Sequence, residues 1–349
     1  MPIIRCLLVL LLIHTIAFGK EPAPAALEIG SKFEAIDTLA CGTETNDDAK
    51  ECLEKLSWPP TKFSVHLEAA APGYGDWLVR FPSARPVGIS RNDMVAMEWY
   101  MARSKEGEAR QAPAIVVVHE SGSKMTVGRL IARGFNAQGL HAFLLQLPGY
   151  GVRRTEEIKD VTHAMPALKQ AIADVRRARD AVVALPLVDR SVVGLEGTSL
   201  GGFVTATVAG LDHGYDRVFI LLAGGNLHEV VLNGAKDAAK TREKLAAAGV
   251  TDDQIKDAAY QVEPLRLAHR IDPSETWLYS GKYDDVVPPC CSYALAKAAR
   301  LAEGHHVELP ANHYSGIIYM PQVVQEMVER MTKPLDANSA EEKSSANTP

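Results

Sequence analysis

The sequence predicts an α/β protein with a doubly wound, mostly parallel sheet and a small helical lid insertion. From residue 113 onward, short apolar runs rich in β-branched residues alternate with segments of helical periodicity. Strands and helices that alternate in this way form parallel sheets joined by right-handed crossovers. The 349 residues, 47% of them hydrophobic, are enough to bury a large core around such a sheet.

The predicted strands follow one another in chain order. The first three are separated by turns that contain Gly or Pro, as hairpin strands are. The fourth is a continuous apolar run too short for a helix, which is typical of a strand buried on both faces. Strands are expected at residues 63–68, 77–81, 94–101, 114–118, 142–147, 191–195, 218–223, 276–279 and 306–309.

Helices are expected between the later strands. Residues 127–138 have a helical pattern, and a longer helix follows the strand at 142–147. Its apolar face carries residues at helical spacing: Met165, Leu168, Ile172, Val175 and Val182. The connection at 226–272 is helical, charged and rich in Ala, and it is too long for a simple crossover. It is therefore either a lid over a site or a surface insertion.

The first residues have the composition of a targeting segment. Arg5 precedes an apolar run, and Ala17 and Gly19 are small residues at the two positions that a signal peptidase reads. This pattern predicts a secretory signal peptide at residues 1–19 and a secreted or periplasmic protein. The apolar run is shorter than the roughly 20 residues of a transmembrane helix, so no stable membrane insertion is expected after cleavage. An uncleaved N-terminal anchor is the alternative.

The rest of the chain divides by composition. Residues 20–60 form an N-terminal extension of unknown structure, and residues 61–332 form the main domain, with the insertion at 226–272 inside it. Residues 333–349 are mostly Ser, Ala, Asn, Glu and Pro, which predicts a disordered tail.

Charge and cysteine content exclude some functions. The net charge of −6 disfavours nucleic acid as a partner, because binding to phosphates requires a basic surface. No His or Cys residues have metal-ligand spacing, so no metal is expected. Cys41 and Cys52 flank a polar stretch and are candidates for a loop-closing disulfide, whereas adjacent Cys290 and Cys291 are expected to be small buried residues.

A candidate nucleophile lies between the strand at 191–195 and an Ala/Val-rich helix. Residues 197–202 read Gly-Thr-Ser-Leu-Gly-Gly and fit the pattern G-x-S-x-G, with Ser199 at its centre. A nucleophilic serine stands on a tight turn between strand and helix, and small residues on either side allow that turn. The alternative is a purely structural turn.

The residues that would activate this serine follow it in the chain. Asp284 lies on the loop after the strand at 276–279, and His313 lies on the loop after the strand at 306–309. This order of nucleophile, acid and base matches hydrolases built on parallel sheets. Asp285 is the competing acid, with an alternative role as a cap of the following helix.

Two backbone N–H groups are candidates for an oxyanion hole. Leu200 follows the nucleophile at the start of a helix, where N–H groups are free to stabilise negative charge. Ser121 follows the strand at 114–118 in the sequence His-Glu-Ser-Gly, and Glu120 is the alternative second donor. A carboxylate beside the oxyanion would oppose catalysis, so the Glu120 side chain must turn aside or bond another group.

These motifs resemble the α/β-hydrolase superfamily, in particular serine esterases such as secreted acyl or acetyl esterases and dienelactone-hydrolase-like proteins. The resemblance spans roughly residues 113–331, but Glu120 replaces the first Gly of the esterase loop H-G-x-G. It implies a carboxylic ester hydrolase without a cofactor, acting on a small-molecule or carbohydrate ester through Ser199, Asp284 and His313. A peptidase or amidase on the same fold and a non-catalytic binding protein are the alternatives. Arg153 and Arg154 are either a site for an acidic substrate group or solvated surface charges.

Overall fold

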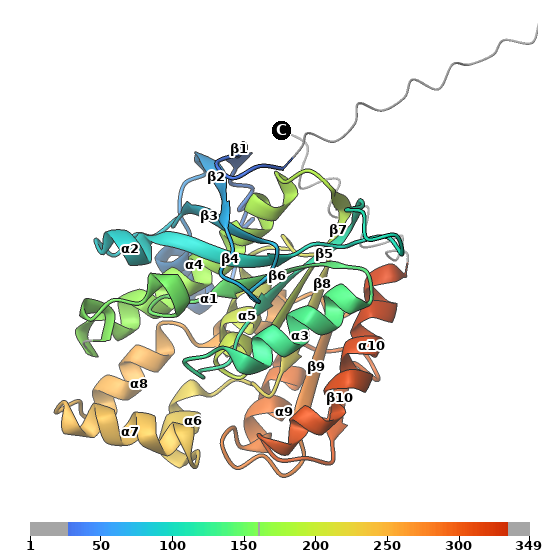
Figure 1. The fold of residues 1–349 in the computed structure, drawn as a ribbon. Helices are drawn as coiled ribbons and strands as arrows, with labels where there is room; N and C mark the ends of the chain where they lie inside the picture. The colour runs from blue at the N-terminus through green and yellow to red at the C-terminus, as the bar shows by residue number, and fades with distance from the viewer. Residues whose placement is uncertain (1–26, 160, 334–349) are drawn as a thin grey trace, which may run out of the picture.

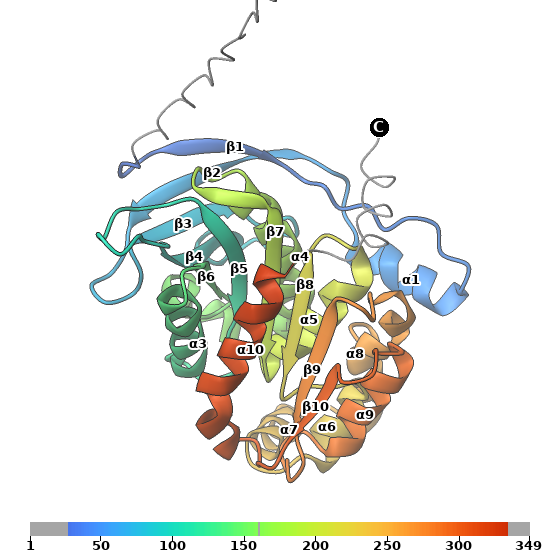
Figure 2. The ribbon, with the colours of Figure 1, turned by 90° about the vertical axis from the view of Figure 1, so that its right-hand side faces the viewer.

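The computed structural model describes residues 27–159 and 161–333 (Figure 1). The predicted signal peptide and the predicted tail beyond residue 333 lie outside the described residues. Within the described part, helices cover both faces of one mixed sheet of 10 strands, which confirms the predicted fold class (Figure 2).

The strand order of the sheet is β1-β2-β3-β4-β6-β5-β7-β8-β9-β10. In this order, neighbouring strands are antiparallel from β1 through β4 to β6. They are parallel from β6 through β5 to β10. Each predicted strand is present, with ends that differ by at most three residues. The strands are β1 (Lys32–Ile36), β2 (Lys62–Ala69), β3 (Trp77–Pro82), β4 (Met94–Tyr100), β5 (Ala112–Val118), β6 (His141–Gln146), β7 (Val188–Thr198), β8 (Arg217–Leu221), β9 (Thr276–Gly281) and β10 (His306–Leu309).

The helices form two layers around the sheet. The helices α3 and α10 pack on one face, and α4, α5 and α9 pack on the other (Figure 2). The α-helices are α1 (Asp47–Leu56), α2 (Ser90–Asp93), α3 (Thr126–Ala137), α4 (Ala164–Val183), α5 (Leu200–Leu211), α6 (Leu227–Asn233), α7 (Asp237–Ala247), α8 (Asp252–Tyr260), α9 (Pro289–Ala298) and α10 (Met320–Thr332). Short 3-10 helices span Gly151–Arg153, Glu157–Lys159, Val161–His163, Pro264–Arg266, Ala268–Arg270 and Ser315–Tyr319. None of the helices within the described ranges is long and apolar enough to cross a membrane.

The described part of the N-terminal extension adds two elements that the sequence did not predict. The strand β1 pairs with β2 at the edge of the sheet, and α1 begins after Asn46, whose side chain accepts a hydrogen bond from the N–H of Ala49. Cys52 is buried in the core and Cys41 is partly buried; both thiols are free, so the disulfide considered from sequence is absent. The expected burial holds for Cys291 but is wrong for Cys290, which is exposed.

A set of buried ion pairs surrounds α4. The Arg153 guanidinium is fully buried and lies 2.7 Å from the Asp174 carboxylate on this helix. It also donates to the backbone oxygens of Asn92 and Gln146. Both interpretations of Arg153 from sequence are therefore wrong, because the side chain reaches neither solvent nor a substrate. Arg154, by contrast, is exposed.

Candidate active site

Ser199 lies on a sharp turn between β7 and α5. Its backbone has φ +54° and ψ −114°, a combination that residues with a side chain rarely adopt. The N–H of Ser199 donates to the Leu221 carbonyl of the neighbouring strand, at 2.8 Å. The rest of the fold therefore holds this strained residue in place, and strained backbone of this kind is concentrated at functional sites.

Glycines around Ser199 make the turn possible. A Cβ atom on Gly201 would lie 2.1 Å from the backbone oxygen of Val118, and one on Gly197 would lie 2.4 Å from the backbone oxygen of Gly201. A Cβ atom on Gly202 would approach the Cβ of Ala223 to 2.6 Å. Because no side chain fits at these positions, the start of α5 packs directly against the ends of its neighbouring strands.

The structure brings the three predicted catalytic residues together. The Oγ of Ser199 lies 2.9 Å from Nε2 of His313, and Nδ1 of His313 lies 2.7 Å from Oδ2 of Asp284. The side chains of His313 and Asp284 are almost fully buried, so this chain of hydrogen bonds is shielded from water. The arrangement matches the geometry by which a base activates a serine nucleophile and an acid orients the base.

Asp284 is oriented by its own loop and bonds the histidine ring, whereas the Asp285 carboxylate bonds Lys236. The second carboxylate oxygen of Asp284 accepts hydrogen bonds from the N–H groups of Val286 and Val287, both at 2.9 Å. Asp285 is exposed and forms an ion pair at 2.9 Å with Lys236. Its alternative role as a cap of α9 is wrong, because Pro288 precedes that helix and the Asp285 carboxylate bonds Lys236 instead. Geometry therefore favours Asp284 as the acid.

The Glu120 side chain lines the same cavity as Ser199, but its carboxylate is bonded to backbone N–H groups. Its two carboxylate oxygens accept from the N–H groups of Val127 and Gly128, at 3.2 and 3.0 Å. These groups belong to the first turn of α3, where N–H groups lack partners within the helix and the helix dipole favours an anion. Glu120 therefore caps α3 from a distance and stabilises the loop between β5 and α3.

Buried His119 fixes the other end of this loop. Its Nε2 accepts from the N–H of Leu147 at 3.1 Å, which leaves Nδ1 to donate to the Glu120 carbonyl at 2.6 Å. Burial lowers the pKa of His119 to about 4, so the ring is neutral near pH 7. The Tyr150 hydroxyl donates to the Ser121 carbonyl at 3.1 Å. Together these bonds hold the backbone of the predicted oxyanion donor Ser121.

A cavity of about 340 Å³ opens beside Ser199 and His313. Ser121 lines it, and Leu200, the other predicted donor, is the first residue of α5. Apolar side chains form much of its wall: Val127, Leu222, Ile317 and Met320. The lining also includes the carboxylates Glu120 and Asp237, and it includes no Lys or Arg. The site is thus small, partly apolar and unfavourable for an anion.

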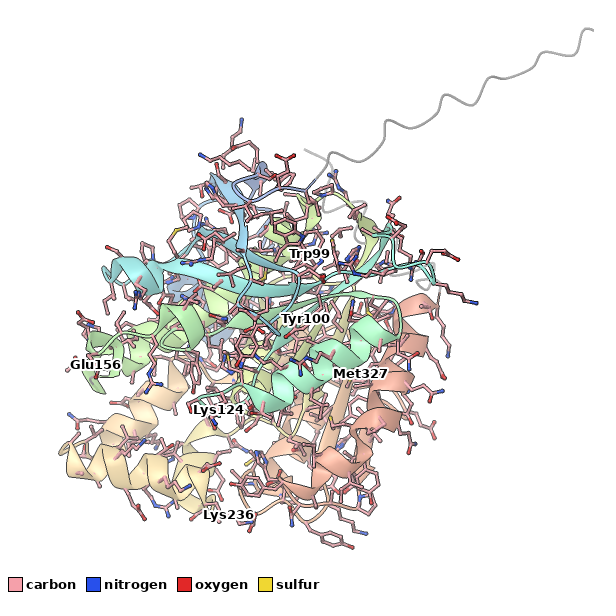
Figure 3. The ribbon with its side chains drawn as sticks, in the orientation of Figure 1. Trp99, Tyr100, Lys124, Glu156, Lys236 and Met327 are labelled. Carbon is pink, nitrogen blue, oxygen red and sulfur yellow. The ribbon has the colours of Figure 1, made fainter. Side chains whose placement is uncertain are left out.

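The insertion contacts the loops that carry Asp284 and His313. Asp237, at the start of α7, accepts a hydrogen bond from the Tyr314 hydroxyl at 2.9 Å. Lys236, labelled in Figure 3, pairs with Asp285, and the N–H of Ala235 donates to the Asp285 carbonyl at 2.7 Å. Because Asp237 also lines the cavity, the insertion forms part of the site. Sequence reasoning missed Asp237 and Tyr314, although Tyr314 directly follows His313.

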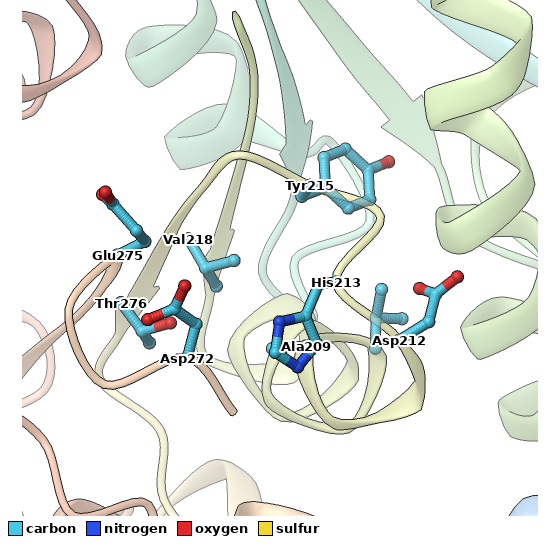
Figure 4. A pocket seen from close by; sticks show the side chains of 9 residues that line it. Ala209, Asp212, His213, Tyr215, Val218, Asp272, Glu275 and Thr276 are labelled. Atoms are coloured by element: carbon cyan, nitrogen blue, oxygen red, sulfur yellow. The ribbon is translucent and has the colours of Figure 1, made fainter. Parts of the chain in front are cut away.

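A second pocket lies at the opposite ends of the parallel strands, where β8 and β9 begin (Figure 4). Its lining includes Asp212, His213, Asp272 and Glu275. The free space is only about 10 Å³, which holds at most one water molecule. Across the described ranges, no group of three or more His, Cys, Asp or Glu side chains is arranged to hold a metal ion.

Comparisons with known proteins identify the fold. No protein-family model matches the chain, and no curated protein matches it in sequence. The acetyl xylan esterase from Paenibacillus sp. R4 superposes with a TM-score of 0.59 at 18% identity, over 82% of this chain and 92% of that chain. Acetyl xylan esterase 1 from Thermoanaerobacterium sp. JW/SL YS485 gives 0.57 at 16% identity, over 82% and 93%.

A puromycin-hydrolysing peptidase of Mycobacterium tuberculosis gives a TM-score of 0.55 at 16% identity, over 78% of this chain and 46% of that chain. At these identities the likeness shows the fold alone, which is the α/β-hydrolase fold.

Proposed function

We propose that this chain, with its α/β-hydrolase fold, is a secreted or periplasmic serine hydrolase that cleaves carboxylic esters. The observation that carries the proposal is the chain of hydrogen bonds from Ser199 through His313 to Asp284 at the wall of a cavity. A non-catalytic binding protein would have no physical need for a strained serine backed by an oriented histidine and a buried carboxylate.

The reaction proceeds through an acyl-enzyme. Ser199 Oγ attacks the ester carbonyl while its proton passes to Nε2 of His313, and Asp284 stabilises the imidazolium that forms. The N–H groups of Leu200 and Ser121 stabilise the oxyanion of the tetrahedral intermediate. His313 then protonates the departing alcohol, and a water molecule activated by the same histidine releases the acid.

Cavity size and charge support a small, uncharged ester as substrate. A volume of about 340 Å³ is at the lower end of the range for ligand pockets. Glu120 and Asp237 would repel an anionic acyl group, whereas the apolar wall suits a short acyl chain. A small-molecule or carbohydrate ester satisfies both conditions.

The second candidate is a peptidase or amidase, because a peptidase shares the fold. The ester proposal is favoured by the small, partly apolar cavity, whereas the likeness to the esterases and to the peptidase shows the fold alone. The same residues would serve either reaction.

A panel of chromogenic substrates tests the proposal. Hydrolysis of p-nitrophenyl acetate, butyrate and octanoate is compared with hydrolysis of alanine p-nitroanilide. Ser199→Ala should abolish turnover, whereas Ser191→Ala, at the far end of β7, should retain it. Preference for the anilide would support the peptidase, and equal turnover by wild type and Ser199→Ala would refute a serine mechanism.

Export is tested separately. N-terminal sequencing of the protein recovered from the periplasm or medium of an expressing bacterium should begin at Lys20. A protein that starts at residue 1 and sediments with membranes would indicate the uncleaved anchor instead.

A further inference from the structure

Glu196 is a fully buried carboxyl group in the strand that leads to Ser199. It lies on β7 between Val117 of β5 and Phe219 of β8, both of which are fully buried. Desolvation raises the pKa of Glu196 to about 8, opposed by the hydrogen bond with Thr198 and assisted by the Glu120 carboxylate. Glu196 is therefore a neutral acid near pH 7, and the mechanism described above does not use it.

Glu196 contacts the active-site cavity through one residue. In this arrangement Oγ1 of Thr198 donates to Oε1 of Glu196 at 2.6 Å, and Thr198 lines the cavity beside Ser199. Side chains two apart on a strand share a face of the sheet, so Thr198 stands between Glu196 and the cavity. Among the described residues, Oε2 of Glu196 has no hydrogen-bond partner.

The protonation state of Glu196 determines what Thr198 can offer a ligand. A neutral carboxyl group can donate its hydrogen to Oγ1 of Thr198, which leaves the threonine hydrogen free to point into the cavity. An ionised carboxylate can only accept, so the threonine hydrogen is directed at Glu196 and away from the cavity. The hydrogen bond between Glu196 and Thr198 thus has two states, and only one of them leaves the threonine hydrogen available to a substrate in the cavity.

We propose that Glu196 is a positioning residue that, as the neutral acid, orients the Thr198 hydroxyl to donate a hydrogen bond to an acceptor atom of the bound ester. The inference rests on the proposed function and adds a specific contact to it.

Besides Thr198, the groups that face Glu196 are one carboxylate and a set of apolar side chains. Glu120, on the loop between β5 and α3, is the charged neighbour that contributes to the pKa shift. The flanking strands present Val117 and Phe219, and α3 and α10 cover this face with apolar side chains. Titration of Glu196 should therefore be visible as an alkaline limb of the pH profile.

The test compares pH profiles of kcat/KM for p-nitrophenyl acetate between pH 6 and 9, corrected for spontaneous hydrolysis. Wild type should lose activity above about pH 8. Glu196→Gln cannot ionise but can still donate through its amide, so it should keep kcat/KM within about threefold of wild type at pH 7 and show no alkaline fall. Superimposable profiles for wild type and Glu196→Gln would overturn the inference.

Substitutions of Thr198 give an independent arm if Glu196→Gln does not fold. Thr198→Val removes the hydroxyl and should lower kcat/KM at pH 7 by about tenfold, with no alkaline fall, whereas Thr198→Ser should restore both features. Unchanged kinetics in Thr198→Val would contradict the inference. Fluorophosphonate labelling separates the two proposals: a labelled Ser199 with unmoved profiles rejects the role of Glu196 alone, and an unlabelled Ser199 rejects the proposed function.

Discussion

Replacement of Asp284 by asparagine should remove most of the activity while leaving its loop intact. One carboxylate oxygen accepts the N–H groups of Val286 and Val287, and the other faces Nδ1 of His313. An amide nitrogen cannot accept those two backbone bonds, so the asparagine oxygen must stay with them. The amide NH₂ then faces Nδ1, which must accept, and the ring hydrogen moves to Nε2. In that tautomer His313 cannot take the proton of Ser199.

The size of the effect follows from this change of tautomer. A triad histidine fixed in the wrong tautomer lowers kcat by about 10⁴-fold, equivalent to about 5.5 kcal/mol of transition-state stabilisation. The fold should be little affected, because the substitution is isosteric and both backbone bonds remain.

The assay is kcat for the best p-nitrophenyl ester at pH 7.5, together with thermal unfolding of each variant. Asp285→Asn is the matched control, because Asp285 is exposed and pairs only with the surface residue Lys236. It should stay within about twofold of wild type, since exposed ion pairs contribute little. A kcat for Asp284→Asn within tenfold of wild type, or an equal loss in Asp285→Asn, would refute the assignment of the acid.

Three further predictions concern stability. Gly201→Ala should lower the free energy of unfolding by about 3 kcal/mol or more, because its Cβ would meet the Val118 backbone oxygen at 2.1 Å. The control Gly134→Ala should cost less, because its Cβ would meet only a side chain. Urea unfolding measures both variants, and equal losses would contradict the packing argument. Glu120→Ala should cost about 1–2 kcal/mol through the lost cap of α3, and an unchanged urea midpoint would exclude this capping role. The pKa of Glu196 is raised from 4.5 to about 8, so between these pH values the native state holds a proton that the unfolded chain releases. As pH rises through this window, the free energy of unfolding of wild type should fall by up to about 5 kcal/mol relative to that of Glu196→Gln. Parallel stability curves would mean that the carboxyl group is not desolvated.

The sequence predicted the central part of the fold because its strands are short, continuous apolar runs. The strand β5 is an example, since Ile115, Val116, Val117 and Val118 are all fully buried between two helical layers. The edge strand β1 gave a weaker signal, because three of its five residues are exposed, Ile36 among them. The helix α1 has a capping residue and acids in its first turn, a signal that was present in the sequence but not used.

The candidate site was predictable where chain order determines it. Ser199, Asp284 and His313 follow one another on loops at the carboxyl ends of strands, and parallel strands bring such loops together. Pairings between distant side chains were not predictable. Arg153 lies against Asp174 and Glu120 against the start of α3 because of how the elements pack, which local sequence patterns do not contain.

The central claim is that Ser199 is an activated nucleophile. Treatment of the purified mature protein with a fluorophosphonate probe, followed by mass spectrometry of the labelled peptide, tests this claim without knowledge of the substrate. The label should be found on Ser199 in wild type and should be lost in His313→Ala. A folded protein that takes up no label, or one labelled equally well in His313→Ala, would contradict the account.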